Sequence, residues 1–266
     1  MDRSREYLGI AVIVGVSIFF ALGNTLANVA YAGGSDPVSL STARFLFPAI
    51  TLAAILALAG KSPALPRRDG VVALALGIVT AVYTLALLSA IEILPVALAV
   101  LIFFLFPILT SLILAIMGWE RLSVTTIAAG VLAFSGLAVA LGINRQALSF
   151  EGIVYAGIAA LGLAVVSAVS GRVIRSGDPR PVTLYILTMA SAVAIAIVLF
   201  RGEYLLPQTI TGWWGFAGSV LFSGIAMVGF FVAISLIGPA RATLFQYGEP
   251  LFTMGTAFLL LGQTLT

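Results

Sequence analysis

The sequence predicts an all-α polytopic membrane protein. Hydrophobic residues make up 61% of the 266 residues and charged residues only 9%, whereas a soluble domain has about 25% charged residues. Such a chain has too few polar side chains to cover a surface that faces water. The apolar residues also lie in long stretches separated by short connectors rich in Gly, Ser, Asp and Pro. This pattern is typical of helices that cross a bilayer.

Nine stretches approach or exceed the roughly 20 apolar residues that a helix needs to cross the hydrocarbon core. They cover Leu8–Ala32, Val38–Ala59, Val71–Ile91, Leu94–Gly118, Val124–Gly142, Gly152–Val173, Pro181–Phe200, Gly212–Ile237 and Ala240–Gly262. No connector between them is long enough to form a soluble domain.

The distribution of Lys and Arg predicts the orientation of the chain. If the N-terminus is cytoplasmic, ten of the 13 basic residues lie on the cytoplasmic side, two lie on the opposite side, and Arg44 lies within the second stretch. Because basic residues are enriched in cytoplasmic loops, we expect the N-terminus inside, in a bacterial-type plasma membrane.

The residue types that are missing exclude several functions. The chain has no Cys and no His, so it lacks thiol nucleophiles, imidazole bases and the commonest transition-metal ligands. No phosphate-binding loop for ATP is present, and the 13 basic residues form no patch for nucleic acid. We therefore expect no metal, no cofactor, no nucleic-acid partner and no catalytic residues.

The two halves of the chain resemble each other. At an offset of 143 residues Ala90-Ile91 meets Ala233-Ile234, and Pro107 meets Pro250. We therefore expect one repeat over residues 1–143 and a second over 144–266. Because five helices per repeat is an odd number, the second repeat is inverted in the membrane, as in many secondary transporters. The second repeat has only four of its five helices in this sequence, so a tenth helix is expected beyond it.

Repeat-related motifs accompany this organisation. Asp36-Pro37 precedes the helix that contains Arg44. Pro107 is followed by Gly118-Trp119-Glu120-Arg121-Leu122, and Glu249-Pro250 is followed by Leu261-Gly262-Gln263-Thr264-Leu265. With these motifs the whole chain resembles the EamA-type transporters of the drug/metabolite transporter superfamily. The resemblance implies export of small metabolites, often amino acids, by alternating access, through a cavity between the third, fourth, eighth and ninth helices.

Within that superfamily the chain resembles the YddG-like amino-acid exporters. Tyr83, the run from Phe103 to Pro107, and Tyr247 are similar to the aromatic-lined site of that subgroup. The resemblance therefore implies that Tyr83, Phe103, Phe106 and Tyr247 line the cavity. Because one helical turn spreads neighbouring residues around the axis, we expect at least one Phe of the run to face lipid or to serve packing.

Polar residues inside the apolar stretches are the other candidates for the site. Glu249 lies about nine residues, roughly 13 Å, inside its stretch, where a carboxylate needs a partner, water or a proton. It is expected to hold a substrate ammonium or a coupled proton, or else to bond the helix carbonyl opened by Pro250. The same reasoning applies to Gln246. Asn24 is expected to face the cavity or to bond a neighbouring helix.

Three further features complete the prediction. Pro107 and Pro250 each kink a helix near mid-membrane, either to form the site or only for packing. Arg44 is expected to pair with Asp36, to snorkel outward, or to bind a substrate carboxylate as part of an outer gate. The small residues of Val124–Gly142 favour a packing face or a homodimer seam.

The leading prediction is thus a secondary transporter that exports amino acids or similar small metabolites, driven by the substrate gradient or by proton exchange. Its partners are that small molecule and the lipid bilayer. Alternative substrates are drugs, nucleotide sugars and other organic anions. A membrane-embedded enzyme or a channel is the alternative in a different class.

Overall fold

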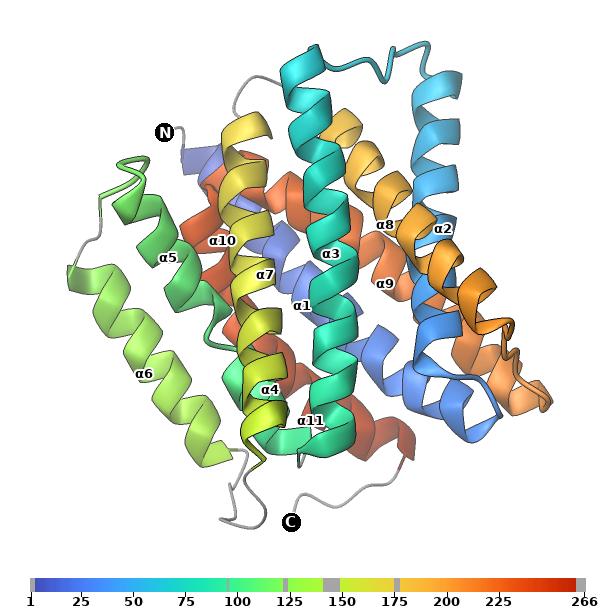
Figure 1. Cartoon of the computed structure of the whole chain (residues 1–266). Coiled ribbons are helices and arrows are strands. Elements are labelled where there is room, and N and C mark those ends of the chain that lie inside the picture. The colour runs from blue at the N-terminus through green and yellow to red at the C-terminus, as the bar shows by residue number, and fades with distance from the viewer. Residues whose placement is uncertain (1–2, 95, 122–123, 141–148, 175–177, 262–266) are drawn as a thin grey trace.

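A computed structural model describes residues 3–94, 96–121, 124–140, 149–174 and 178–261 of the chain. In these ranges it contains only helices, packed into one bundle (Figure 1). The described residues do not include Arg145 and Arg175, which were counted for the orientation of the chain. They also do not include Gln263 of the C-terminal motif.

Eleven α-helices and one 3-10 helix are formed by the described residues. They are α1 (Arg3–Ala32), α2 (Pro37–Leu58), α3 (Arg67–Ile93), α4 (Val96–Phe103), α5 (Phe106–Ile116), α6 (Val124–Ala140), α7 (Phe150–Ile174), α8 (Pro179–Arg201), α9 (Ile210–Ile237), α10 (Pro239–Phe245), η1 (Gln246–Gly248) and α11 (Glu249–Leu261).

All nine predicted stretches contain helix, but the prediction of nine membrane-spanning helices is confirmed for only seven. Among the described residues, seven spans are long and apolar enough to cross a membrane, with Leu98–Ile116 as one of them. The fifth stretch forms α6, which has only 17 described residues. The ninth stretch is divided into α10, η1 and α11, none of which is long enough by itself.

Side chains in the connectors determine where several helices begin and end. Asp36, Asp178 and Thr209 are the N-caps of α2, α8 and α9, and each accepts a hydrogen bond from a backbone N–H in the first turn. Such caps satisfy donors that the helix itself leaves free. Gly202 ends α8 in the left-handed conformation that glycine adopts without strain.

The helices pair in a reciprocal pattern. The first helix, α1, packs against α9, and the third, α3, packs against α7, while α2 packs against α8. Under the proposed division α7, α8 and α9 are the first, second and third helices of the later half. In Figure 1, α1 runs downward and α7 runs upward. Reciprocal contacts and opposite directions are expected of two inverted repeats.

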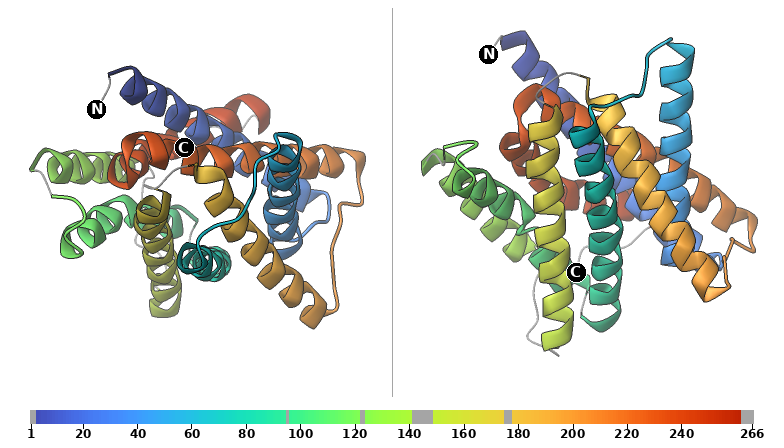
Figure 2. Two further views of the ribbon diagram at one scale, coloured as in Figure 1. Left: turned by 90° about the horizontal axis from the view of Figure 1, so that it is seen from above. Right: turned by 45° about the horizontal axis from the view of Figure 1, so that its top comes forward.

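Helix α6, the fifth helix of the first half, lies at the periphery of the bundle. It lies at one edge of the bundle beside α5 (Figure 2), and several of its apolar side chains are exposed, with Val124 and Val139 each 82% exposed. Gly136 has no neighbour close to the place where a Cβ would stand. The small residues of α6 therefore are not all used for packing within the chain.

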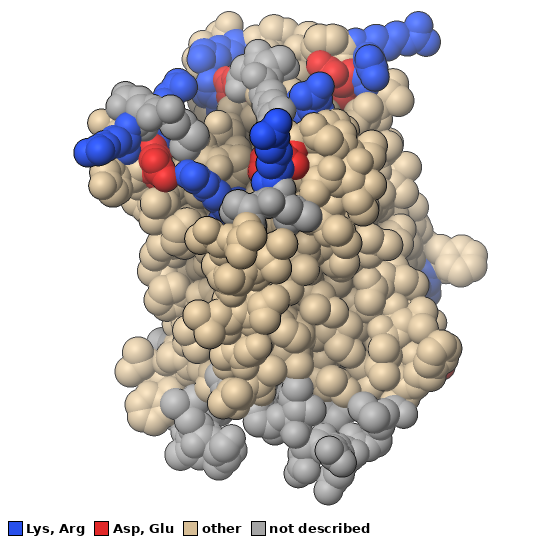
Figure 3. Space-filling view, turned by 90° about the vertical axis from the view of Figure 1, so that its left-hand side faces the viewer, with Lys and Arg blue, Asp and Glu red and all other residues tan. Residues whose placement is uncertain are grey.

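Basic side chains gather at one end of the bundle. Figure 3 shows Lys and Arg concentrated at the end where the N-terminus lies, above a flank with almost no charge. The helix order places Lys61, Arg67, Arg121 and Arg180 at this end. Arg201, at the C-terminal end of α8, lies at the opposite end and pairs with Asp36. The uncharged flank between the two ends is the part that suits the hydrocarbon core.

The contact between α1 and α9 is the most extensive helix contact in the structure and depends on glycine. A Cβ added at Gly215 of α9 would lie only 2.7 Å from the backbone nitrogen of Ala30 and 2.8 Å from the backbone oxygen of Leu26. Backbone atoms of α1 cannot move aside without displacing the helix. Small residues of this kind allow membrane helices to approach closely.

Gly215→Ala should therefore destabilise the protein, by about 1–3 kcal/mol, as is typical of overpacking. Fluorescence-detected size-exclusion chromatography after heating in detergent should show a lower melting temperature for this variant. Gly15→Ala, at a glycine with open space around it, is the matched control and should melt at or above the wild-type temperature. Equal melting of both variants would show that α1 and α9 are not this close.

Candidate functional site

Two of the predicted apolar stretches, the fourth and the ninth, are broken near their middle. In the fourth, α4 ends at Phe103 and α5 begins at Phe106. In the ninth, α10 passes into the 3-10 turn η1, and α11 begins at Glu249. Both breaks thus occur at equivalent places in the two halves.

The breaks fall at the two prolines that the sequence singled out. Pro107 and Pro250 are each the second residue of a half-helix. A proline in the first turn of a helix leaves no hydrogen bond unmade, because the N–H of that position has no partner within the helix. Starting a new helix is therefore less costly than bending one around the proline ring.

A chain of hydrogen bonds joins three polar side chains next to the second break. Nη2 of Arg44, on α2, donates to Oδ1 of Asn24, on α1, over 3.1 Å. Nδ2 of Asn24 donates in turn to Oε1 of Glu249, on α11, over 3.0 Å. The amide of Asn24 thus lies between a cation from the first half and a carboxylate from the second half.

Glu249 is the first residue of α11 and follows directly on the 3-10 turn η1. Within the apolar segments a charged side chain is costly unless it is paired. Arg44 and Glu249 meet this requirement together, through Asn24.

Tyr83 joins this group from α3. It is close enough to Arg44 and Glu249 to interact electrostatically with both. Its own helix packs tightly on α7 here, because a Cβ at Gly162 would lie 2.5 Å from Cβ of Tyr83. The polar group is therefore assembled from α1, α2, α3 and α11, whereas the predicted cavity was to lie among the third, fourth, eighth and ninth segments.

A second contact between α1 and α11 was not predicted. The hydroxyl oxygens of Thr25 and Thr256 lie 2.7 Å apart and share a hydrogen bond. Thr25 directly follows Asn24 in the chain, so two adjacent residues of α1 hold α11. Threonine is common in apolar helices and usually bonds its own backbone, so neither residue stood out in the sequence.

Aromatic side chains fill the first break. The ring centres of Phe103, Phe104 and Phe106 lie 5.4–5.7 Å apart, and Tyr247 of η1 lies 6.1 Å from Phe104. Phe104 and Phe106 belong to a buried hydrophobic cluster against which Phe103 packs. This packing agrees with the expectation that at least one Phe of the run faces lipid or serves packing. Phe104 was not among the predicted site residues.

Four buried side-chain polar atoms have no hydrogen-bond partner among the described residues. One is the hydroxyl oxygen of Ser223, on α9, and the other three are Nε of Arg44, Oε1 of Gln246 and the hydroxyl oxygen of Tyr247. Gln246 is 3% exposed and Tyr247 is 8% exposed. Unsatisfied buried polar atoms are rare and costly in native proteins. The last three belong to predicted site residues, at or beside the second break, so a polar ligand would find unused donors and acceptors there.

One of the roles that the sequence left open for Arg44, an ion pair with Asp36, requires a correction. Asp36 caps α2 by accepting a hydrogen bond from the backbone of Ser39, 3.0 Å away, and its other oxygen accepts one from Arg201, 2.8 Å away. Arg44 is eight residues further along α2, about 12 Å deeper, and bonds Asn24 instead. The ion pair therefore ties the α1–α2 connector to the end of α8.

Asp36 titrates below its usual range. Partial burial by itself would raise the pKa of this carboxyl, but hydrogen bonds from Ser39 and Arg201 outweigh burial and lower the pKa. A lowered pKa in the folded state means that this contact stabilises the protein above the ordinary pKa. The stabilisation is lost only as the pH falls through the lowered value.

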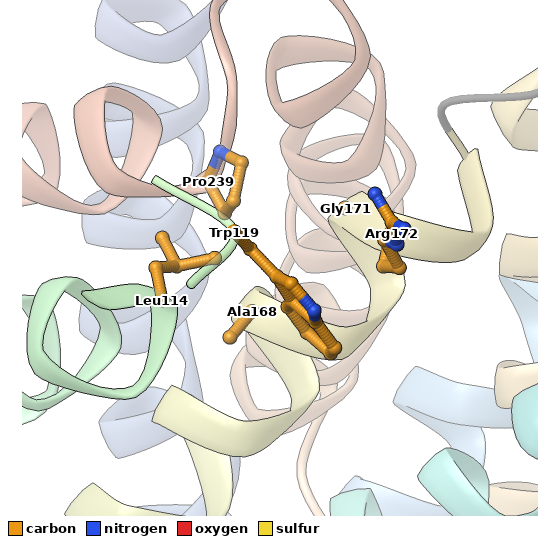
Figure 4. A pocket seen from close by; sticks show the side chains of 6 residues that line it. All are labelled: Leu114, Trp119, Ala168, Gly171, Arg172 and Pro239. Carbon is orange, nitrogen blue, oxygen red and sulfur yellow. The ribbon is translucent and has the colours of Figure 1, made fainter. Parts of the chain in front are cut away.

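The pockets of the structure lie away from the polar group. Figure 4 shows one of them, between the ends of α5, α7 and α10, where the guanidinium of Arg172 lies 5.7 Å from the ring centre of Trp119. Its lining side chains leave no room for a ligand, not even for one water molecule. A second one lies between α2, α3 and α8. Neither is lined by Arg44, Asn24 or Glu249, whose neighbours pack closely.

Within the described residues no three acidic side chains gather as a metal site would require, and the chain has no His or Cys. The polar group therefore offers one cation, one carboxylate, one amide and one phenol. Such a set can bind a small charged molecule through hydrogen bonds.

Comparison with known proteins supplies the remaining findings. The sequence profile of the EamA-like transporter family matches residues 7–142 and again residues 150–266. No curated protein matches the chain. A protein of known crystal structure superposes with a TM-score of 0.77 over 97% of this chain and 90% of its own, at 18% sequence identity. At that identity the likeness shows a shared fold.

The unsatisfied hydroxyl of Tyr247 leads to a prediction about stability. Tyr247→Phe should melt at the wild-type temperature or above it, since it removes a buried polar atom whose desolvation costs about 1–3 kcal/mol. Tyr204→Phe, in the exposed α8–α9 connector, is the matched control and should not change the melting temperature. A clear loss of stability in Tyr247→Phe alone would show that the hydroxyl has a partner in the folded protein.

Proposed function

Because the chain belongs to the EamA-like transporter family, we propose that it exports amino acids or similar small metabolites from the cytoplasm by alternating access. The family is one of membrane transporters rather than of enzymes, and the chain is a multi-pass membrane protein. The substrate, the direction of transport and the orientation of the chain in the membrane are proposals.

One observation carries the substrate class. The buried polar group contains one cation and one carboxylate, Arg44 and Glu249, bridged by an amide. A neutral amino acid likewise carries one carboxylate and one ammonium. Phe104 and Phe106 pack together at the first break, and such aromatic residues line the site of the YddG-like exporters that the sequence resembles.

Organic anions and nucleotide sugars are the alternative substrates, and they would need an excess of positive charge. Arg44 is balanced by Glu249. Arg241, the other cation that the sequence offered, lies at the N-terminal end of the bundle and pairs with Glu6 over 2.7 Å. The balanced charge favours a substrate without net charge.

We propose two inverted repeats, residues 1–143 and 144–266, as the moving framework. The two family matches fall within these ranges, and the reciprocal helix contacts support a twofold relation. The polar group joins α1, α2 and α3 of the first repeat to α11 of the second. A site at the boundary between repeats is where transporters of this construction bind their substrates. A homodimer through α6 stays a prediction of the sequence.

The function is tested by efflux from bacterial cells preloaded with amino acids by dipeptide feeding. Cells that express the protein should release particular neutral amino acids faster than cells without it. Glu249→Gln should reduce this release by about tenfold or more, because a charged hydrogen bond to the ammonium contributes roughly 1.5–3 kcal/mol. Glu203→Gln makes the same substitution at an exposed carboxylate and should leave efflux unchanged.

Failure to accelerate the release of every amino acid tested would contradict the proposed substrate class and direct attention to organic anions and drugs. Equal effects of Glu249→Gln and Glu203→Gln would show that the buried carboxylate does not contact the substrate.

We further propose that the N-terminus is cytoplasmic in a bacterial-type plasma membrane, supported by the basic residues at that end (Figure 3). The chain has no cysteine, so single-cysteine variants report cleanly. In intact cells a membrane-impermeant maleimide should label Glu203→Cys and should label Lys61→Cys only after permeabilisation. The reverse pattern would invert the orientation and turn export into import.

A further inference from the structure

The hydrogen bonds of Asn24 have a defined direction. Its amide oxygen accepts from Nη2 of Arg44, and its amide nitrogen donates to Oε1 of Glu249. A guanidinium can only donate and an ionised carboxylate can only accept, so the opposite orientation of the amide would place like groups together. One uncharged group thus presents an acceptor to the cation and a donor to the anion.

This arrangement uses only part of Arg44. Nε and Nη2 form the side of a guanidinium that binds a carboxylate through two parallel hydrogen bonds. Nη2 is occupied by the single oxygen of the Asn24 amide, 3.1 Å away. Nε is buried and has no partner among the described residues. A carboxylate, with two oxygens, would satisfy both nitrogens where an amide satisfies one.

We infer that Asn24 is a placeholder for the head group of the substrate, an α-amino acid in its zwitterionic form. The substrate carboxylate takes Nε and Nη2 of Arg44, and the ammonium takes Oε1 of Glu249, so that both ends of the Asn24 amide are displaced. The inference rests on the proposed amino-acid export and assigns the recognition of the head group to these residues.

The chemistry of the exchange favours the zwitterion over singly charged molecules. In an α-amino acid the carboxylate and the ammonium are attached to one carbon, so they are neighbours, as are the oxygen and nitrogen of an amide. A zwitterion replaces two weaker contacts with two charge-assisted ones. An amine or an acid alone would displace the amide and leave one buried charge without a partner, which is strongly unfavourable.

Displacement of Asn24 also loosens the contact between the repeats. The hydrogen bonds described between α1 and α11 are those of Asn24 with Glu249 and of Thr25 with Thr256. Binding of the substrate breaks the hydrogen bond between Asn24 and Glu249. The contact between α1 and α11 is thereby weakened at the place where the ninth segment is already broken.

The first test uses the unmodified full-length protein in proteoliposomes. The amino acid that gives the fastest efflux from cells is compared with its carboxamide, which lacks the negative charge, and with its deaminated acid, which lacks the positive charge. Each is measured as a competitor of the labelled amino acid. Both analogues should bind at least about tenfold more weakly, as expected for loss of one charged hydrogen bond.

An analogue whose inhibition constant lies within about threefold of that of the parent amino acid would overturn the head-group assignment. The proposed export would not be affected by that result. If no amino acid is exported at all, the proposed function fails and the head-group assignment fails with it. The two failures are therefore distinguishable.

The second test removes the placeholder. Asn24→Ala should lower the KM for the amino acid several-fold, because the substrate no longer competes with the amide. Asn28→Ala is the matched control, since Asn28 lies one turn further along α1, is exposed, and bonds only the backbone oxygen of Asn24. A raised or unchanged KM in Asn24→Ala would show that Asn24 is not displaced. The analogue comparison stands whether or not this variant folds.

Discussion

The structure depends on how one guanidinium and one carboxylate are accommodated between apolar helices. Arg44 and Glu249 are separated by 205 positions in the chain, and each would be costly in the membrane without a partner. The amide of Asn24 satisfies both at once through bonds of 3.1 and 3.0 Å. Because the three side chains come from α2, α1 and α11, this single arrangement requires the two halves of the chain to meet here.

The carboxylate of this arrangement lies at a break in the ninth segment. The 3-10 turn at Gln246–Gly248 makes Glu249 the first residue of α11. Pro250 suits the position that follows, because a proline in the first turn needs no backbone partner for its nitrogen. The break and the hydrogen bond to Asn24 therefore occur at the same residue.

The sequence predicted the membrane helices and many of the site residues, but not how those residues meet. Hydropathy identified every helical segment because the length of a span is fixed by the bilayer. Repeat-related Pro107 and Pro250 identified the broken segments. In contrast, the hydrogen bond from Asn24 to Glu249 joins residues 225 positions apart, and no local pattern encodes such a contact. Asp36 was one of several partners or roles that the sequence left open for Arg44, and it bonds Arg201 instead.

The aromatic cluster shows the same limit at shorter range. At least one Phe of the run was expected to face lipid or to serve packing, but the sequence did not show which one. In the structure the rings of Phe103, Phe104 and Phe106 pack together, with Tyr247 next to Phe104. Where a helix ends is decided by tertiary contacts and not by propensity alone, and the directions of the side chains follow from that.

The central claim is that an amino-acid head group takes the place of the Asn24 amide between Arg44 and Glu249. A cryo-electron microscopy structure of the protein in lipid nanodiscs with a transported amino acid tests it most directly. The account predicts the substrate carboxylate on Nε and Nη2 of Arg44, the ammonium on Glu249, and the Asn24 side chain turned away. A bound amino acid elsewhere, with both hydrogen bonds of Asn24 intact, would contradict it.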